Sequence, residues 1–428
     1  MKRVLTGALL ALAITLPAQA QDLKPRDRGS PIKSHHEYVQ LFDELVETVG
    51  KHFYDPYFHG ADWNAIVAEH RPQLRGVRSD EDFHRLAKAM LAKVRSSHLD
   101  IRMPADSPAR TVGIGAQFRQ IGEELVITHV DPLSDARRQG LRPGQVLLTP
   151  IDQLQGAVGS TASPRVRTCT GQERVVAVRR ESMFWPPQRP SFRWYAITTA
   201  PDKRIGYLRA DRFDDGDAEL ADKAMADLAD TDALIIDIRQ NSGGNASALR
   251  LASYFTDGAV PSIVLLTREW LDRLGRPVTA QDVLAAPRAD RIYTDAQVFE
   301  AVQAGGGGVA LWTEDVGDRR YRKPVIVLIG EDTGSAGEGF AWHMRLKTEA
   351  TLMGRKTAGA LLSSERIEIG DGWTLVLPVH GIWAPDGGNY GDKPVPPHVV
   401  VPQSRNDLCA GRDPELEAAI DRLMGRRG

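Results

Sequence analysis

Residues 324–344 read PVIVLIGEDTGSAGEGFAWHM, and the rest of the chain is organised around them. Five apolar residues, 325–329, lie between Pro324 and Gly330, which predicts a strand buried on both faces. A polar turn follows, and Ser335 then begins a run of helical character. The start of such a helix carries free backbone N–H groups and the positive end of the helix dipole. A serine at this point is therefore well placed to attack a carbonyl, because the oxyanion it forms meets those donors.

The same residues also have a purely structural interpretation. Ser335 and Glu338 have the spacing of a capping box, in which each side chain satisfies a backbone N–H of the other residue. The stretch alone does not decide between these two interpretations, so the rest of the chain has to.

Length and composition limit the possible functions. The 428 residues are enough for two or three domains, and the formal net charge of −2 argues against nucleic-acid or membrane-surface binding through bulk electrostatics. No CxxC or HExxH cluster is present, so we expect no metal site. The two cysteines, Cys169 and Cys409, either form a disulfide or remain as buried thiols.

The first twenty residues have the pattern of a secretory signal. Lys2 and Arg3 precede an apolar centre at residues 9–16, and residues 18–20 read AQA, a typical cleavage site. No later apolar run approaches 18 residues. We therefore expect a periplasmic or secreted protein that does not insert in the membrane after signal cleavage.

Helical spacing dominates the next part of the chain. Apolar residues recur every three or four positions from residue 38 to residue 49, and further helices are expected from about Trp63 and from the capped start at Ser79. The third helix ends close to Ser97 and His98. A lone histidine at a helix end is usually a charge partner of the helix dipole or a surface residue. We assign residues 21–108 to an N-terminal helical domain.

Residues 109–190 resemble a PDZ domain. A G-I-G segment, an alternating strand and the run DPLSDARRQGLRPGQVLL follow one another in the order of that family, with departures at Asp135, Gln139 and Gln145. The resemblance implies that Gly113, Ile114 and Gly115 form a loop that binds a peptide carboxylate. A PDZ-shaped spacer without a ligand is the alternative.

From residue 191 to residue 428 strands alternate with helices, which predicts an α/β domain with a largely parallel sheet and a final helix after Asp413. We interpret residues 267–320 as an insertion, with a flexible glycine run at 305–308. Such a segment would suit a lid over a cleft.

Three motifs in this part resemble the tail-specific, or C-terminal processing, serine peptidases. Residues 237–244 read DIRQNSGG, residues 333–338 read TGSAGE, and residues 354–359 read GRKTAG, in the order of that family. The resemblance covers nearly all of the chain after residue 20. It implies a crotonase-like ββα spiral for the catalytic domain, polypeptide substrates and no cofactor.

That family has two catalytic designs. One uses a lysine as general base at the position that is Ala360 here, whereas Lys356 lies four residues earlier. The other resembles the tricorn protease core, in which a Ser-His pair ends the helical domain, as Ser97 and His98 do here. The absence of the lysine favours Ser335 as nucleophile and His98 as base.

The remaining site residues follow from the same resemblance. Ser97 belongs to a relay, and Asp392 is the acid nearest to the expected glutamate position, where this chain has Gly391. Gly243 and Ala336 supply the N–H groups of the oxyanion hole. The alternatives are a surface turn at Asp392 and a plain strand–helix turn or phosphate loop at residues 243–244.

These observations predict an exported serine endopeptidase that cleaves unfolded or tail-exposed proteins. Two alternatives belong to other classes: a peptide- or ligand-binding protein on the same scaffold without turnover, and a coenzyme A-thioester enzyme. The export signal argues against the second, because that cofactor is cytosolic. A peptidase with Lys356 as base is a further alternative.

Overall fold

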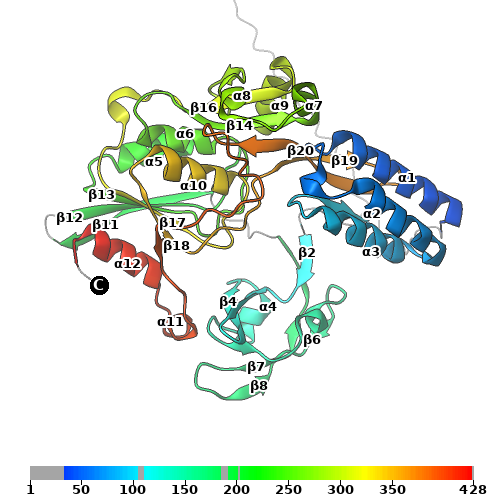
Figure 1. The fold of residues 1–428 in the computed structure, drawn as a ribbon. Helices are drawn as coiled ribbons and strands as arrows, with labels where there is room; N and C mark the ends of the chain where they lie inside the picture. The colour runs from blue at the N-terminus through cyan, green and yellow to red at the C-terminus, as the bar shows by residue number, and fades with distance from the viewer. Residues whose placement is uncertain (1–32, 105–109, 185–190, 201–202, 427–428) are drawn as a thin grey trace, which may run out of the picture.

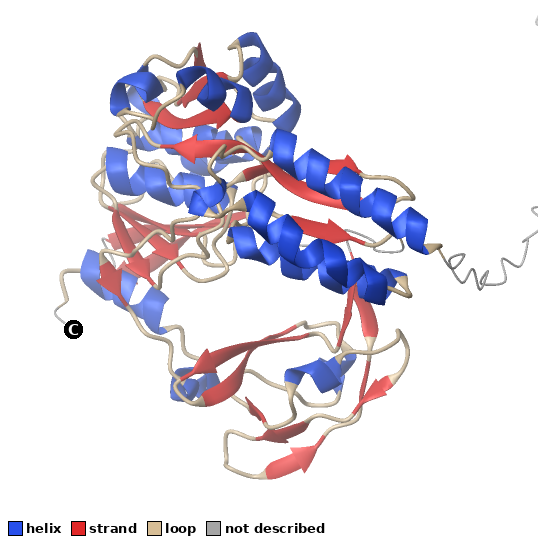
Figure 2. Ribbon diagram, turned by 45° about the vertical axis from the view of Figure 1, so that its right-hand side comes forward, coloured by secondary structure: helices blue, strands red, loops and turns tan. Residues whose placement is uncertain are grey.

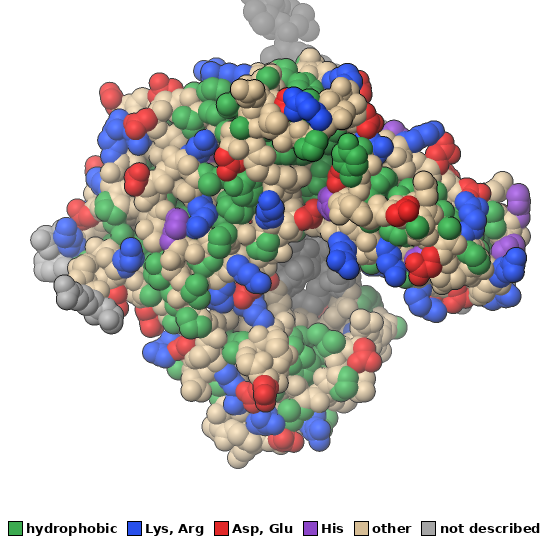
Figure 3. All heavy atoms as spheres, viewed as in Figure 1, with side chains coloured by type: hydrophobic (Ala, Val, Ile, Leu, Met, Phe, Trp, Pro, Cys, Tyr) green, Lys and Arg blue, Asp and Glu red, His purple; other side chains and the backbone are tan. Residues whose placement is uncertain are grey.

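A computed structural model describes residues 33–104, 110–184, 191–200 and 203–426. Figure 1 shows a helical region, a small β-rich module and a larger α/β body. The signal peptide expected at residues 1–20 lies outside the described residues. Within the described ranges, no helix is both long and apolar enough to cross a membrane. On the face drawn in Figure 3, acidic and basic side chains are interspersed, in keeping with the small net charge.

The N-terminal region consists of helices with one apolar face, as their spacing predicts. Ser34 and Ser79 cap the first and third α-helices by accepting hydrogen bonds from the N–H groups of Glu37 and Asp82. The elements are α1 (His35–His52), η1 (Phe58–Gly60), α2 (Trp63–His70), η2 (Arg71–Gly76), α3 (Asp80–Leu91) and η3 (Ala92–Val94).

These helices share their core with a mixed sheet built from distant parts of the chain. The short strand β1, which begins two residues after His98, pairs antiparallel with β20, with Ile101 opposite Leu375. The ring of Phe83 meets the buried indole of Trp373 edge to face at 5.1 Å. The helical region is therefore anchored on C-terminal strands. The order is β1-β20-β14-β16-β15 with β19 also on β20: β1 (Asp100–Arg102), β14 (Pro261–Thr267), β15 (Arg288–Ala289), β16 (Gly308–Trp312), β19 (Ser363–Glu368) and β20 (Thr374–Trp383).

The second large sheet is parallel except for its first pair of strands. Leu234 and Ile236 of its third strand pack against helices on one face, and Ile235 packs against the last helix on the other. The strand predicted at residues 325–329 is β17, and it is buried on both faces. The order is β11-β12-β13-β17-β18-β21: β11 (Phe192–Ala200), β12 (Lys203–Ala210), β13 (Ala233–Asp237), β17 (Val325–Ile329), β18 (Thr351–Gly354) and β21 (Val399–Val400), with α5 (Asp217–Asp227), α6 (Ala248–Ala252), η5 (Ser253–Phe255) and α10 (Ala336–Lys347) on one side.

Residues 110–184 form a β module with its own core around Ile127, Leu141 and Val166. Figure 2 shows this module on one side of the molecule, next to the helical region and the body. Its strands are β2 (Arg110–Gly113), β3 (Ala116–Ile121), β4 (Glu124–Val130), β5 (Val146–Leu147), β6 (Thr161–Ala162), β7 (Arg165–Arg167), β8 (Glu173–Val175), β9 (Val178–Arg179) and β10 (Glu181–Phe184), with α4 (Asp135–Arg138) and η4 (Ile151–Leu154).

Residues 267–320, which we interpreted as an insertion, form regular helices and strands. The segment contributes β15 and β16 to the mixed sheet, and Gly308 is a buried residue of β16 that pairs with Leu266. The N–H groups of Gly305, Gly306 and Gly307 donate to carbonyls of the preceding helix, and the Gly307 carbonyl accepts the Thr267 N–H of the sheet, contacts that local composition does not reveal. The rest of the segment is α7 (Arg268–Leu274), α8 (Ala280–Leu284), α9 (Asp295–Ala304) and η6 (Gly317–Arg319).

A disulfide connects the β module to the C-terminal part of the chain. Cys169, between β7 and β8, is bonded to Cys409, and their Cα atoms are 5.7 Å apart. Cys409 lies in α11 (Arg405–Ala410), where Arg405 also donates to the carbonyl oxygen of Gly144 at 3.0 Å. Pairing is thus the alternative that the structure adopts. The last helix, α12 (Pro414–Leu423), has Asp413 as its cap and proline in the first turn, as predicted.

Replacing both cysteines by serine is expected to lower the free energy of unfolding by about 2–4 kcal/mol, because the cross-link closes a long loop in the unfolded chain. Calorimetry of the oxidised protein and of the double variant measures the difference. Addition of a reductant should reproduce the loss in the wild type and change nothing in the variant. Equal transitions for the oxidised protein and the variant would contradict this prediction.

Candidate active site

Ser335 lies on the strained turn between β17 and α10. It is the residue before the helix and has φ 49° and ψ −125°, a conformation that residues other than glycine rarely adopt. Its N–H donates to the carbonyl oxygen of Ala360 at 2.7 Å, and the N–H of Gly334 donates to the carbonyl oxygen of Asn241 at 2.9 Å. The Ser335 side chain makes no capping hydrogen bond to α10. The complete capping box is therefore not formed, and the hydroxyl remains available for chemistry.

Glu338 has a further role besides the one that a capping box would give it, which is to accept the backbone N–H of Ser335. Its carboxylate is fully buried and accepts hydrogen bonds from the Thr357 hydroxyl, from the Gly359 N–H at 2.6 Å and from the Ala360 N–H at 2.6 Å. Burial raises the pKa of this carboxyl, and the hydrogen bonds from the Thr357 hydroxyl and from the N–H groups of Ala360, Gly359 and Ser335 oppose the rise. Glu338 thus holds the segment whose carbonyl at Ala360 fixes Ser335.

The two glycines of residues 243–244 approach the nucleophile very closely. A Cβ atom on Gly243, which has φ 121°, would lie 2.5 Å from Cβ of Ser335, so no larger residue fits. The Gly243 N–H donates to the side-chain oxygen of Asn241 at 2.9 Å, whereas Gly244 and Ala336 line the cavity that contains Ser335. Gly243 can therefore serve an oxyanion only if Asn241 releases this N–H, and its role remains a prediction.

His98 lies in the loop between η3 and β1 and lines the same cavity as Ser335. It has φ 59°, which turns the chain sharply before β1, and its Nδ1 is 3.3 Å from the hydroxyl oxygen of Ser97. Burial lowers the pKa of the His98 imidazole below its ordinary value, and the negative charge of Asp392 opposes part of the fall. A neutral imidazole is the form that accepts a proton.

Asp392 lies beside the Ser-His pair. Its Oδ1 accepts a hydrogen bond from the Ser97 N–H at 2.8 Å, and its Oδ2 is 3.8 Å from Nε2 of His59. His59 in turn is 2.8 Å from the Tyr54 hydroxyl and 3.8 Å from a carboxylate oxygen of Asp55. Asp392 therefore contacts the backbone that carries His98, and its charge acts on the imidazole through space.

The other predicted residues lie elsewhere. Lys356 has an exposed side chain and is not among the residues that line the cavity of Ser335. Gly113, Ile114 and Gly115 belong to the β module: Gly113 pairs with Glu181, the Ile114 side chain is in the module core, and the Gly115 carbonyl accepts the Asp131 N–H at 2.9 Å. No cluster of three or more metal-ligating side chains occurs among the residues with described positions.

Sequence reasoning missed His59, Asn241 and Asp295. His59 and Asp295 reach the site through tertiary structure from an irregular turn and from the start of α9, and neither has a local sequence signal. Asn241 lies within the DIRQNSGG motif. Asparagine side chains often accept the backbone N–H two residues later, so the bond from the Gly243 N–H could have been predicted.

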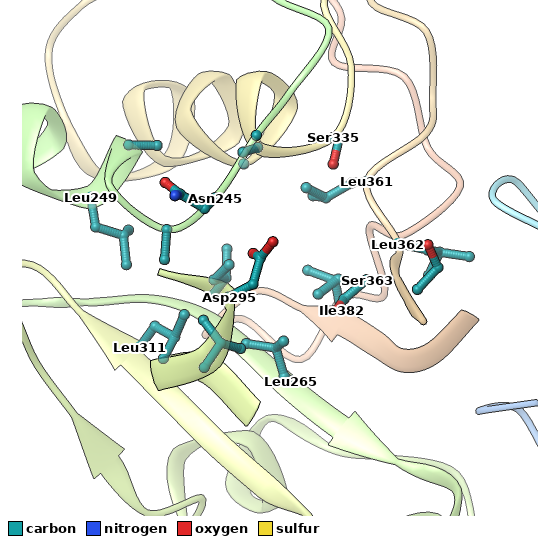
Figure 4. A pocket seen from close by; sticks show the side chains of 18 of the residues that line it. Asn245, Leu249, Leu265, Asp295, Leu311, Ser335, Leu361, Leu362, Ser363 and Ile382 are labelled. Carbon is teal, nitrogen blue, oxygen red and sulfur yellow. The ribbon is translucent and has the colours of Figure 1, made fainter. Parts of the chain in front are cut away.

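The cavity itself is about 270 Å³ and mainly apolar. Figure 4 shows the Ser335 hydroxyl at one side of it and Asp295, Asn245 and several leucines around it. Further lining residues are Ala248, Leu249, Ile263, Leu265, Val298, Phe299, Leu311, Phe340, Leu361, Leu362, Ser363, Ser364 and Ile382.

A serine on a strained strand–helix turn and a histidine that lines the same cavity are the parts that a serine hydrolase site requires. Comparison with known proteins indicates the family of peptidases to which the chain is similar. Residues 204–401 match the model of peptidase family S41, and residues 34–92 match the tricorn protease C1 domain. The chain belongs to peptidase family S41, a family of serine-type peptidases.

Individual relatives agree with this assignment. A putative tricorn protease homologue and a second tricorn protease homologue, both from Streptomyces coelicolor, are each 24% identical over 90% of this chain, which spans only 32% and 35% of their lengths. A carboxyl-terminal-processing protease from Synechocystis is 25% identical over 91% of this chain and 87% of its own. Among solved structures, mature CPAF in complex with lactacystin superposes with a TM-score of 0.67 at 16% identity, over 91% of this chain and 98% of that one.

Replacing Glu338 by glutamine is expected to lower the free energy of unfolding by about 1–3 kcal/mol, because an amide NH₂ would face buried N–H donors. The reactivity of Ser335 toward a fluorophosphonate should fall as well, since the carbonyl of Ala360 loses its fixed position. Chemical denaturation and labelling kinetics measure the two effects. Glu349→Gln, which changes an exposed glutamate near the other end of the same helix–strand unit, is the control. If both variants are equally stable and reactive, Glu338 does not hold this segment.

Proposed function

We propose that the protein is an exported serine endopeptidase that hydrolyses peptide bonds of unfolded or tail-exposed proteins. The observation that carries the proposal is the shared cavity, which Ser335 enters from the turn before α10 and His98 enters from the end of the helical region. Membership of a serine-type peptidase family supports polypeptides as the substrates.

The chemistry follows from the properties of these groups. His98, kept largely neutral by burial, takes the proton of Ser335 as the hydroxyl oxygen attacks the peptide carbonyl. Backbone N–H groups at residues 243–244 and at Ala336 stabilise the oxyanion, and each such donor typically contributes about 3–4 kcal/mol. The imidazolium then protonates the leaving amine, and water hydrolyses the acyl-enzyme by the same proton transfers in reverse.

Ser97 and Asp392 act as positioning residues in this proposal. The Asp392 carboxylate fixes the backbone at Ser97, and its negative charge stabilises the imidazolium that forms on His98. Asp392 occupies the role that a relay acid has in other serine hydrolases, although it contacts the backbone and not the imidazole.

Further features support the finer parts of the proposal. The mixed parallel sheet with helices on both sides fits a crotonase-like ββα spiral, and the glycine turn and β-rich core of residues 110–184 fit a PDZ-like domain that binds peptide C-termini at residues 113–115. The signal-like start of the chain and the Cys169–Cys409 disulfide both support a periplasmic or secreted location, since disulfides persist in oxidising compartments.

One observation favours a second candidate, a binding protein on this scaffold without turnover. The Gly243 N–H is bonded to Asn241 and so is not presented to an oxyanion. A peptidase requires that this bond opens, or that Gly244 supplies the donor; a binding protein requires neither.

A fluorophosphonate probe distinguishes the candidates. We expect wild-type protein to be labelled and Ser335→Ala to remain unlabelled. His98→Ala should reduce the labelling rate and the hydrolysis of unfolded casein by at least about 100-fold, because the general base is lost. Lys356→Ala should leave both rates close to those of the wild type. No labelling of the wild type would support the binding protein, and loss only in the Lys356 variant would make that lysine the base.

The pH dependence of labelling tests the roles of His98 and Asp392. The rate should rise with pH through a midpoint below the usual histidine value of about 6.5, because burial disfavours the imidazolium. Asp392→Asn should move this midpoint to lower pH, since the lost negative charge no longer stabilises the imidazolium, while the amide oxygen can still accept the Ser97 N–H. Asp55→Asn, a carboxylate beside His59, is the control. A shift to higher pH, or equal shifts in both variants, would refute the role of Asp392.

A further inference from the structure

The disulfide between Cys169 and Cys409 is open to solvent on one side. Cys169 lies in the exposed turn between β7 and β8, whereas Cys409 is partly buried near the end of α11. Gly144 packs so closely on Cys409 that a Cβ atom there would lie 2.5 Å from the sulfur. Cys169 is therefore the residue that an external thiolate can approach, and exposed disulfides are the ones that thiols open most readily.

A cation lies beside the inner half of this disulfide. Arg405 precedes Cys409 by one helical turn in α11. Its Nε donates to the carbonyl oxygen of Gly144 at 3.0 Å, and the sulfur of Cys409 lies 3.4 Å from the same oxygen. A nearby guanidinium stabilises a thiolate electrostatically. Attack on Cys169 thus releases the sulfur of Cys409 as a thiolate next to a positive charge.

The disulfide is one link in a ring of contacts that returns to the active site. Helices α11 and α12 are consecutive in the chain, and Asp413 caps α12. Asp413 and Glu415 each place a carboxylate oxygen 2.7 Å from Nη1 of Arg239. Arg239 belongs to the DIRQNSGG motif, which ends in the glycines that touch Ser335. The C-terminal helices are therefore bonded to the loop beside the nucleophile.

Glu415 extends the ring to the turn before the nucleophile. Its side chain is buried, and its second oxygen pairs with Arg355. Arg355 in turn pairs with Glu331 at 2.8 Å, in the turn between β17 and Ser335. A buried carboxylate is costly to separate from its guanidinium partners, so a displacement of α12 is transmitted to both arginines.

The β module closes the ring from the other side. Arg119 of β3 lies 3.3 Å from a carboxylate oxygen of Glu331 and 3.0 Å from one of Asp332. It also donates to the side-chain oxygen of Gln403, just before α11, at 3.3 Å. The module is thus joined to α11 by a covalent bond and to the nucleophile turn by ion pairs.

Opening the disulfide leaves this ring without its one covalent link. The Arg119 ion pairs that remain on the module side are partly exposed, and such pairs contribute little net stability in water. The positive φ of Ser335 persists only while the surrounding structure enforces it. A freer turn therefore lets Ser335 relax from the strained conformation that presents its hydroxyl.

We propose that the Cys169–Cys409 disulfide is a redox switch that controls the reactivity of Ser335, with the oxidised protein as the reactive form. The proposal rests on the peptidase function proposed above and adds a regulation of its site. Thiols stay reduced in the cytosol, where an exported chain is made. The switch keeps the peptidase weakly reactive until the chain reaches an oxidising compartment.

The reducing step needs a dithiol, either a small molecule or a dithiol protein. One thiolate of the reductant attacks the sulfur of Cys169, the S–S bond breaks, and Cys409 leaves as a thiolate. The second thiolate of the reductant then attacks the mixed disulfide and releases Cys169. Two electrons pass from the dithiol to the protein, the two cysteine sulfurs take up two protons, and the reductant becomes a disulfide.

The first test measures fluorophosphonate labelling of Ser335 before and after reduction with dithiothreitol, where near-ultraviolet circular dichroism shows both forms folded. Reduction should slow labelling by at least about fivefold, the lower end of coupling between distant sites, and reoxidation should restore the rate. The double variant Cys169→Ser, Cys409→Ser should label at the reduced rate with or without dithiothreitol. Equal rates for folded oxidised and reduced protein would overturn the proposal.

The second test separates the lost link from the presence of free thiols. Dibromomaleimide joins the two sulfurs of the reduced protein through a two-carbon bridge and should restore most of the labelling rate. N-ethylmaleimide modifies each thiol separately and should not. Equal labelling rates after the two reagents would show that the link is not the cause.

The third test interrupts the ring at α12. Glu415→Gln should lower the labelling rate of the oxidised protein and weaken its response to dithiothreitol, because the ring is already open. Glu417→Gln, an exposed acid on the same helix, should keep the wild-type rate and the full response. A full response in folded Glu415→Gln would contradict the route through α12.

Hydrogen exchange separates the switch from the peptidase function, because it measures the turn at residues 330–336 without any activity. Faster amide exchange there on reduction, in a protein that the fluorophosphonate labels in neither form, would support the redox coupling and reject the peptidase. Labelling at one rate in both forms, with unchanged exchange of the turn, would reject the coupling and keep the peptidase.

Discussion

The antiparallel pairing of β1 with β20 brings the two halves of the candidate site together. It begins two residues after His98 and connects the helical region to strands formed late in the chain. The buried rings of Phe83 and Trp373 extend the same contact into a common hydrophobic core. Because the sheet and the core fix the loop before β1, the imidazole of His98 lines the cavity that Ser335 enters from the opposite end of the sequence.

The second constraint is the strain at Ser335. A serine with positive φ costs of order 1–3 kcal/mol and persists only when the surrounding structure enforces it. Here the hydrogen bond from its N–H to Ala360, the buried Glu338 that holds residues 357–360, and the side-chain-free Gly243 enforce it together. An ion pair also holds the turn that precedes the nucleophile. In it, Arg119 of the β module lies 3.0 Å from a carboxylate oxygen of Asp332. A change in the position of the module would therefore act on this turn directly.

Much of this arrangement could be predicted from the sequence, for physical reasons that differ between elements. The buried strand β17, the capped helices α1 and α3 and the proline start of α12 follow from local periodicity and capping. The grouping of Ser335, His98 and Asp392 came from the order of motifs and not from any local signal. The role of residues 267–320 could not be predicted, because β16 is a strand only by pairing with β14, and Asp295 enters the cavity only through that fold. The bond from Gly243 to Asn241 likewise depends on the folded turn.

In the proposed mechanism His98 serves as the base for Ser335. A crystal structure of the protein after reaction with a peptide phosphonate tests it most directly, because the adduct fixes the nucleophile as it is in the acyl transfer. We expect phosphorus bonded to Oγ of Ser335 and a ring nitrogen of His98 at hydrogen-bond distance, about 2.6–3.2 Å, from Oγ or a phosphonyl oxygen. An adduct at Ser335 with the imidazole of His98 turned away and another base, such as Lys356, in its place would show that His98 is not the base.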